Sequence, residues 1–448
     1  MAINATSGFT ADIQNFIRDE LLPVAQRTLV LYQLGDPATL PEGMGLTFTA
    51  TRYNRIPLPY APLSEGVPPI GETLTISQVT AVCQQWGDAV RITDLAELTT
   101  KHPLMATANE LIGIQVGELL ERNAFNALLG GTQVNYVMSR GSRAALTAGD
   151  VLDTHTVNRT VVALDTIGAY KFNGPMDTDL KMKAAEQASK AYKNPAGEPH
   201  YVGIMHTLVK GDIKENAQVV LASSYSNVNY LYNSEAGWWA GMRFCASNLV
   251  PTWTGQAQIS ATAVPTGGSF AASTLYIIVT GSDTQNQYES QIYQVSTSTA
   301  TVVLNGSITV VLPSTTGYTY SVYVGTTNSP TNLGLSASGP TNGPLQGQAT
   351  QMAPGQTVTI TGTGMFQVPP AAPTTGVTVY PTFVIGRGYF ANVKLKDVEI
   401  TWLDQPDKSD WLNQLRIVGW KATYGELITN AQFGARIESA SAFTSTFG

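Results

Sequence analysis

One stretch, Leu104 to Gly131, constrains the fold more than any other because it keeps a single structural period without a proline. Its apolar residues recur at steps of three and four, the spacing of a helix that packs along one face. These residues are Leu104, Ala108, Leu111, Ile112, Val116, Leu119, Leu120 and Leu128. Pro103 precedes the stretch and Gly130-Gly131 ends it. At about 1.5 Å per residue the helix would span about 35–40 Å, which suits the central helix of a large subunit.

Two glycines, Gly113 and Gly117, lie one helical turn apart inside this stretch. Without a Cβ they allow another segment to approach closely, so we expect close packing at this point. The charged residues Glu110, Glu118, Glu121 and Arg122 fall largely off the apolar stripe. Glu118 and Arg122 lie one turn apart and make a favourable pair.

The composition leaves two interpretations open. Charged residues make up 13% of the 448-residue chain, about half the usual share. This favours either an ordinary β-rich globular protein or a subunit whose surface is largely covered by copies of itself, where exposed charge would be costly to desolvate. The net charge of −7 argues against broad nucleic-acid binding, which needs clustered Lys and Arg.

The two cysteines, Cys83 and Cys245, are too far apart to indicate a disulfide framework or a zinc motif. We predict buried thiols in a chain made in a reducing compartment. The N-terminus shows no signal-peptide pattern, and no apolar run reaches the length of a membrane span. The sequence thus predicts no export and no membrane.

Residues 45–94 predict a long hairpin-like excursion with a proline-rich tip. It follows an amphipathic helix predicted for residues 10–34 and has too few apolar residues to bury itself. A long segment of this kind is usually functional or disordered, and its strand-like limbs favour an arm that packs on another subunit. We predict inter-subunit contacts through Arg52, Arg55, Pro57, Pro59, Tyr60 and Glu65. The equally weighted alternative is that these charges only keep the surface soluble.

The chain changes character between Phe244 and Gly386, where no Lys or Arg occurs. Short strand-like runs at regular spacing predict an inserted β-sandwich at residues 255–375, of immunoglobulin or fibronectin type III kind. Asn305-Gly306 predicts a two-residue type I′ hairpin, and the proline-rich exit at residues 366–376 resembles a linker.

The sequence predicts no enzyme, no metal site and no cofactor. Gly386, Gly388 and Ala391 match a dinucleotide-binding motif on paper, but the following residues alternate as a strand instead of starting the required helix. The four histidines show no metal-ligand spacing, and no nucleophile elbow or phosphate-binding loop occurs. We therefore predict a structural protein without catalytic residues.

Five stretches together resemble the major capsid proteins of tailed bacteriophages, in particular the family typified by the major capsid protein of the N-four coliphage. They are residues 48–69, 81–98, 110–132, 200–217 and 414–439. The resemblance implies an α+β Hong Kong 97-like fold with an N-terminal arm, an extended loop, a peripheral domain with a long spine helix, and an axial domain. Residues 255–375 depart from it, because that fold does not require them.

The resemblance also implies a division of the chain. The expected parts are an N-terminal arm at 1–44, the extended loop and its flanking strands at 45–98, the peripheral domain at 99–155, the axial domain at 156–254, the insertion at 255–375, an axial return at 376–405, and the peripheral long strand and C-terminus at 406–448. Gly113 and Gly117 would then face the long C-terminal strand or the N-terminal arm.

The function implied is a subunit that self-assembles into an icosahedral shell around double-stranded DNA without sequence-specific binding. Its expected partners are copies of itself in hexamers and pentamers, with scaffolding, portal and decoration proteins and no membrane. Its expected place is the virion, assembled in the cytoplasm of a bacterial host. The rival interpretation is a β-rich adhesin or carbohydrate-binding protein. For the insertion we predict an outward-facing decoration that binds glycan or a host surface weakly, with bracing of neighbouring subunits as the alternative.

Overall fold

The computed structural model describes residues 29–54, 56, 58, 62, 71–100, 104–172, 199–216, 219–221, 234–259, 261–283, 288–294, 301–325, 334–335, 353–360, 365–366, 371–403 and 414–443. The chain divides into two compact units. The first unit comprises Met1–Thr132 and Gly386–Gly434, and the second comprises Gln133–Ile385 and Ala435–Gly448. Segments distant in sequence therefore build each unit.

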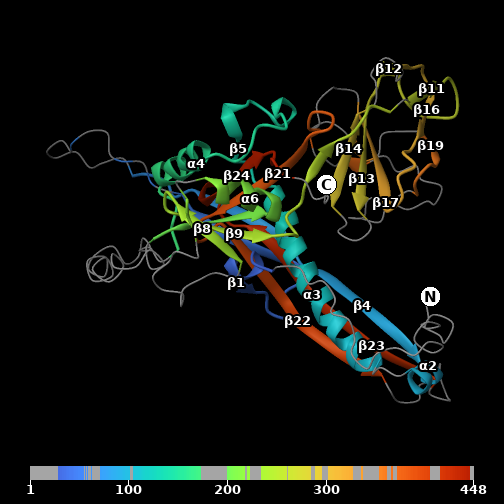
Figure 1. The fold of residues 1–448 in the computed structure, drawn as a ribbon, viewed down its shortest axis with the longest axis horizontal. Helices are drawn as coiled ribbons and strands as arrows, with labels where there is room; N and C mark the ends of the chain where they lie inside the picture. Colours follow the sequence, from blue (N-terminus) through green and yellow to red (C-terminus); the bar gives the residue numbers. More distant parts are fainter. Residues whose placement is uncertain are drawn as a thin grey trace. The chain divides into compact units, whose positions relative to one another are not determined.

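The first unit is built on one helix and one sheet. The sheet has the order β1 (Asp36–Thr39), β22 (Phe390–Leu403), β23 (Leu415–Ile428) and β4 (Gln84–Thr93), with β1 parallel to β22 and the other neighbours antiparallel. Helix α3 (Leu104–Leu129) runs along it (Figure 1), which confirms the predicted helix. Ile112 and Val116 pack on Val418, Trp420 and Tyr424 of β23, because the helix stripe and the alternating strand residues present apolar faces to each other.

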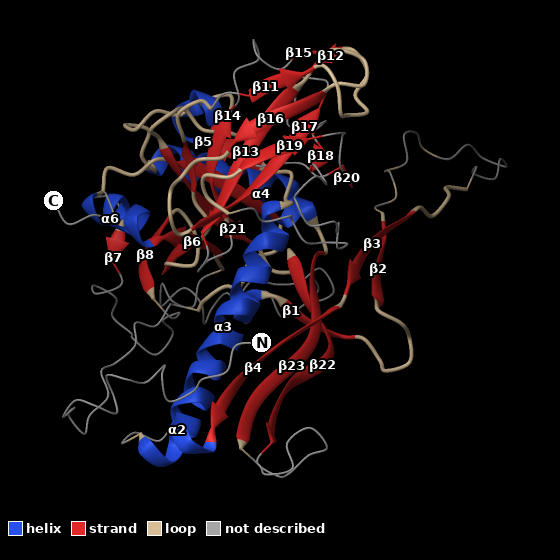
Figure 2. Cartoon of the chain, turned by 90° about the vertical axis from the view of Figure 1, so that its right-hand side faces the viewer, coloured by secondary structure: helices blue, strands red, loops and turns tan. Residues whose placement is uncertain are grey.

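The predicted excursion is a two-stranded hairpin (Figure 2). β2 (Thr47–Tyr53) and β3 (Ile76–Val82) pair antiparallel from Thr47↔Val82 to Tyr53↔Ile76. Its root is anchored where Phe48 and Ala81 join a core with Val393 and Leu427. The short helix α2 (Asp94–Thr99) follows β4, and the hydroxyl of Thr93 caps it by accepting from the Ala96 amide.

The second unit is centred on a large sheet. Its order is β20-β18-β17-β13-β14-β10-β21-β6-β9-β8-β7, and β24 pairs with both β21 and β5. Helices α4 (Thr154–Ile167) and α6 (Thr207–Glu215) also belong to this unit. The strands are β5 (Val134–Tyr136), β6 (Tyr201–His206), β7 (Val220–Leu221), β8 (Glu235–Trp239), β9 (Met242–Ser247), β10 (Trp253–Gly255), β13 (Tyr276–Asp283), β14 (Glu289–Gln294), β17 (Tyr318–Gly325), β18 (Gly334–Leu335), β20 (Met365–Phe366), β21 (Thr378–Ile385) and β24 (Gly434–Ser439).

The insertion has its own core between two sheets. A three-stranded sheet of β11 (Ala261–Val264), β16 (Ser307–Val311) and β19 (Thr357–Ile360) contributes Ile308 and Val310 to this core. β13 and β17 contribute Val279 and Val322 from the opposite side. This two-layered packing follows from the alternation of apolar and polar residues in each strand. The assignment to the immunoglobulin or fibronectin type III kind stays a prediction.

The prediction of a hairpin at Asn305-Gly306 is wrong. A turn is present, because the Gly306 amide donates to the Val303 carbonyl at 2.9 Å and Asn305 has a φ of 63°. The strands on either side have different partners, however: β15 (Thr301–Val302) pairs with β12 (Ser273–Thr274), whereas β16 pairs with β11 and β19. The turn thus carries the chain from one sheet to another.

The two units do not coincide with the parts that the resemblance implies, and that division stays a prediction. The segment expected as an axial return, 376–405, is divided, because β21 pairs with β6 in the second unit whereas β22 pairs with β23 in the first. Residues 133–155 and 435–448, expected in the peripheral part, belong to the second unit, where β24 pairs with β5. Most of the helix predicted for residues 10–34 lies outside the described residues, and its end is a 3-10 turn, Tyr32–Leu34.

Candidate functional site

The titratable groups in the described ranges do not gather into a metal site. No group of three or more His, Cys, Asp and Glu that could hold a metal ion occurs among them. Cys83 and Cys245 are both buried free thiols, as predicted, and burial raises the pKa of Cys245 to about 12. Burial lowers the pKa of His206 to about 4, and its Nδ1 accepts from the Leu208 amide at the start of α6. In the described parts of the chain, no helix is long and apolar enough to span a bilayer.

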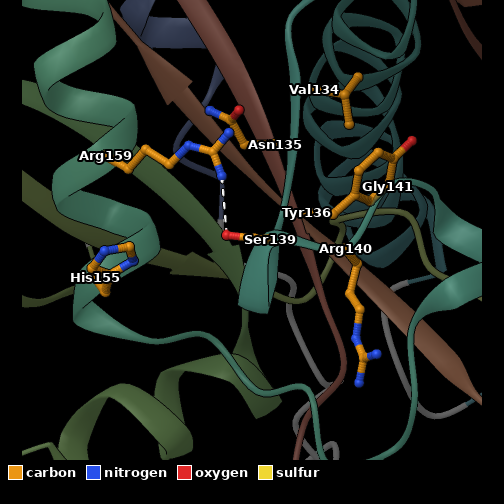
Figure 3. A pocket seen from close by; sticks show the side chains of 8 residues that line it. All are labelled: Val134, Asn135, Tyr136, Ser139, Arg140, Gly141, His155 and Arg159. Carbon is orange, nitrogen blue, oxygen red and sulfur yellow. Dashed lines mark hydrogen bonds between the residues drawn. The ribbon is translucent and has the colours of Figure 1, made fainter.

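A polar hollow of about 560 Å³ lies beside the 3-10 turn Val137–Ser139 in the second unit. Figure 3 shows the Arg159 guanidinium directed at the Ser139 hydroxyl, which accepts at 3.4 Å, while Arg140 points away. Arg140 forms an ion pair with Asp150 at 3.0 Å, so its charge is compensated. Met138 and Ser139 both have left-handed backbone, with φ of 52° and 54°. The hollow is a polar surface feature that the sequence did not single out.

The predicted contact residues of the hairpin are largely outside the described residues. Arg52 lies on β2 opposite Ser77 and is exposed. Arg55, Pro57, Pro59, Tyr60 and Glu65 belong to the ranges that the structure does not describe. The inter-subunit role of these residues therefore stays a prediction.

The two helix glycines lie in different surroundings. A Cβ at Gly117 would be 2.7 Å from Cδ1 of Leu29, so the N-terminal segment passes close to the helix there. Among the described residues, nothing lies within 4 Å of a Cβ built at Gly113. The described part of the N-terminal segment thus reaches Gly117, and the described parts of both segments expected at these glycines stay more than 4 Å from a Cβ built at Gly113.

Glu121 fixes the N-terminal segment to α3. Its carboxylate accepts from the consecutive amides of Val30, Leu31 and Tyr32 at 2.7, 2.7 and 2.8 Å. Leu31 precedes the 3-10 turn and has no side chain that could cap it, so the carboxylate from the helix takes that role. Burial raises the pKa of Glu121, and the three amide hydrogen bonds oppose this rise.

Sequence reasoning missed Glu121, because it placed this residue off the apolar stripe. The side chain is fully buried, since the buried face of α3 widens in its second half to include Asn123, Ala124 and Phe125. A signal existed: Glu121 is one turn from Gly117 and one turn from Phe125. The charge itself gave no hint that three amides would compensate its burial.

A second set of buried polar contacts lies where the insertion joins the rest of the second unit. Arg143 donates from Nε and Nη2 to the two carboxylate oxygens of Glu438, both at 2.7 Å. The side chains of both residues are almost fully buried, at 7% and 0% exposure. The Arg143 guanidinium also lies 3.6 Å from the ring centroid of Trp253 and donates to the Ala371 carbonyl at 2.9 Å. One side chain therefore joins the C-terminal strand to the residues where the insertion leaves and returns.

The entry and exit of the insertion are held together by backbone contacts as well. The Gly376 amide donates to the Gly255 carbonyl at 2.8 Å, and the Thr374 hydroxyl donates to the Ala144 carbonyl at 2.8 Å. A Cβ at Gly255 would lie 2.4 Å from the Thr374 carbonyl oxygen, so this approach requires glycine. The expectation of a linker at 366–376 is thus wrong for its described end, 371–376, which is fixed to the sheet. The insertion also continues that sheet, because β14 pairs with β10.

Comparisons with known proteins agree with this architecture. No protein-family profile and no curated protein sequence matches the chain. Among solved structures, the capsid of Ralstonia phage GP4 matches with a TM-score of 0.50 and 11% identity, covering 100% of both chains. The capsid of cyanophage P-SCSP1u matches with a TM-score of 0.48 and 10% identity, over 99% of this chain and 97% of that one. The first of these matches shows the fold: the chain has the α+β Hong Kong 97-like capsid fold that the sequence predicted.

Proposed function

We propose that the chain is a structural major capsid protein that self-assembles into the icosahedral shell of a tailed bacteriophage. The observation that carries this proposal is the fold match to the Ralstonia phage GP4 capsid along the full length of both chains. Low charge suits a surface that is covered by neighbouring copies. A net charge of −7 suits a shell that encloses double-stranded DNA without gripping it.

The proposed partners are copies of the chain in hexamers and pentamers, together with scaffolding, portal and decoration proteins. The test is expression of the full chain in bacteria, alone and with its scaffold, followed by sedimentation and negative-stain microscopy. Closed shells of uniform diameter are expected. A persistent monomer under both conditions would refute the proposal. That result would favour the alternative function, a β-rich adhesin, which predicts that the monomer binds to a glycan array.

For the insertion we propose an outward-facing decoration on this shell. Its separate core supports the idea, because the buried residues of that core all lie within the insertion, between Ala261 and Ile360. The bridge between Gly255 and Thr375 makes a clean deletion feasible. A variant that lacks residues 256–370 and is closed by a short Gly-Ser linker keeps the exit segment and the Arg143 site. Shells of normal size are expected from it; failure to assemble, with the variant folded, would assign the insertion a bracing role instead.

A further inference from the structure

A small open pocket lies where the second half of α3 passes over β23 and β4 in the first unit. Figure 2 shows these elements side by side, and the pocket holds about 280 Å³. Asn123, Tyr424 and Glu426 line it from the helix and from β23, and Trp86 lines it from β4. Among the other lining residues, Gln84 and Asn126 are exposed. The pocket is therefore accessible from outside the chain.

One carboxylate oxygen of Glu426 accepts no hydrogen bond from the described residues. Its Oε1 is buried and has no hydrogen-bond partner among the described residues. A buried acceptor left without a donor costs about 1–3 kcal/mol, so such groups normally have a partner or a function. Burial raises the pKa of Glu426 to about 7, although its own backbone amide opposes the shift.

The titratable groups around Glu426 do not neutralise its charge. Burial and then the Glu426 carboxylate raise the pKa of Tyr32, of Cys83 and of Tyr424, so all three are uncharged near pH 7. The Asp397 carboxylate also raises the pKa of Tyr32. Arg122 of α3 lowers the pKa of Tyr424. Among the described residues, these groups leave Oε1 of Glu426 without a donor and its carboxylate without a compensating charge.

The walls of the pocket favour an organic cation over a metal ion. The rings of Trp86 and Tyr424 are stacked, with centroids 6.5 Å apart and an interplanar angle of 27°. Asn123 donates from Nδ2 to the Tyr424 hydroxyl at 3.2 Å and so holds that ring in place. Aromatic faces attract ammonium and guanidinium groups, whereas Mg²⁺ and Ca²⁺ require six or more oxygen ligands. One carboxylate beside an aromatic wall matches an alkylammonium or guanidinium group.

We propose that this pocket is a socket for the Lys or Arg side chain of a second copy of this chain, with Glu426 as its anionic floor. The second copy as the source rests on the proposed function, because a shell subunit is surrounded by copies of itself. The charged carboxylate binds a cation more strongly than the neutral acid does. The contact therefore strengthens as the pH rises through about 7.

The first test measures cation binding by the unassembled full-length chain. Carboxyl ¹³C NMR follows the titration of Glu426, assigned with the Glu426→Gln variant, in n-butylammonium chloride and in sodium chloride of equal ionic strength. At about twice the dissociation constant, butylammonium should lower the pKa of Glu426 by about 0.5, because it binds the charged form. The exposed Glu110 on the same helix serves as the control and should not shift. Equal pKa values of Glu426 in the two salts would overturn the socket.

The second test asks whether the occupant comes from another copy. Glu426→Gln removes the charge and keeps the shape, and Glu110→Gln is the matched control. For Glu426→Gln, the subunit concentration at half-maximal assembly should rise about tenfold at pH 8, the change for losing one charge-assisted hydrogen bond. Assembly at the wild-type concentration, with the variant folded, would refute a second copy as occupant. If the wild-type chain forms no shells, the proposed function fails, and the NMR titration still decides whether the pocket binds an ammonium ion.

Discussion

Replacing Arg143 by Met tests the role of the insertion junction most directly. The substitution keeps a long apolar side chain against Trp253 but removes both hydrogen bonds to Glu438 and the one to the Ala371 carbonyl. Glu438 would remain fully buried. Nε of Arg436 would still donate to Oε1 of Glu438, at 2.9 Å. The variant thus leaves a buried carboxylate with one charged neighbour instead of two.

The expected loss of unfolding free energy follows from this geometry. Breaking a buried ion pair by removing one partner costs about 3–5 kcal/mol, because the remaining charge stays desolvated. Arg436 still compensates part of the charge on Glu438, so we expect the lower end, about 3 kcal/mol. The double variant Arg143→Met/Glu438→Leu removes the stranded charge. It should therefore be less destabilised than the sum of the two single variants.

The assay is urea unfolding of the full chain, followed by circular dichroism and tryptophan fluorescence. Arg140→Met is the control, because Arg140 is 40% exposed and the Asp150 carboxylate that it pairs with keeps the Thr147 amide as a donor; a smaller loss than for Arg143→Met is expected. A loss for Arg143→Met below about 1 kcal/mol, or equal to that of the control, would refute the reasoning. If the losses of unfolding free energy in the two single variants add up to the loss in the double variant, Arg143 and Glu438 do not stabilise each other.

Three further predictions concern the first unit. Gly117→Leu should lower stability by about 1–3 kcal/mol because Leu29 lies 2.7 Å from the site of a Cβ, whereas Gly113→Leu should be tolerated; thermal melting compares the two. Glu121→Gln should lower the free energy of unfolding by about 2 kcal/mol and speed hydrogen exchange of the Val30, Leu31 and Tyr32 amides, which donate to the wild-type carboxylate. Unchanged exchange would contradict the role of Glu121 in holding the N-terminal segment. The raised pKa of Glu426 means that its ionisation destabilises the fold as the pH rises from about 4.5 to about 7. Glu426→Gln should therefore gain up to about 3 kcal/mol at pH 8 and nothing below pH 4.5, measured by urea unfolding across pH.

Much of the fold could be predicted from local patterns. The periodicity between Leu104 and Gly131 predicted α3 nearly to its ends. Val418, Trp420, Ala422 and Tyr424 alternate along the sequence, and they form the face of β23 that is buried against α3. Such patterns are readable because a helix or strand must present its apolar residues to the core at its own period. The turn at Asn305-Gly306 was also correctly located, but its strands were joined wrongly, since pairing depends on partners distant in sequence.

The sites were far less predictable than the elements. Glu121 and Glu438 read as ordinary charged residues, yet both are fully buried. A buried carboxylate is stable only if donors converge on it, and these donors come from Val30 to Tyr32 and from Arg143 and Arg436. Glu121 and Leu31 are 90 residues apart in the sequence, and Glu438 and Arg143 are 295 residues apart. No local pattern records an approach over that distance.

By itself, the sequence determined which segments form helix or strand, that residues 255–375 differ in kind, and that the chain resembles a shell subunit. Apolar periodicity and composition are local properties, so they can be read along the chain. Only the tertiary structure decided that the N-terminal segment is fixed by Glu121, that Arg143 fixes the insertion, and that Glu426 faces an open pocket. These three features depend on charges that are desolvated by distant segments, and desolvation is a property of the folded chain alone.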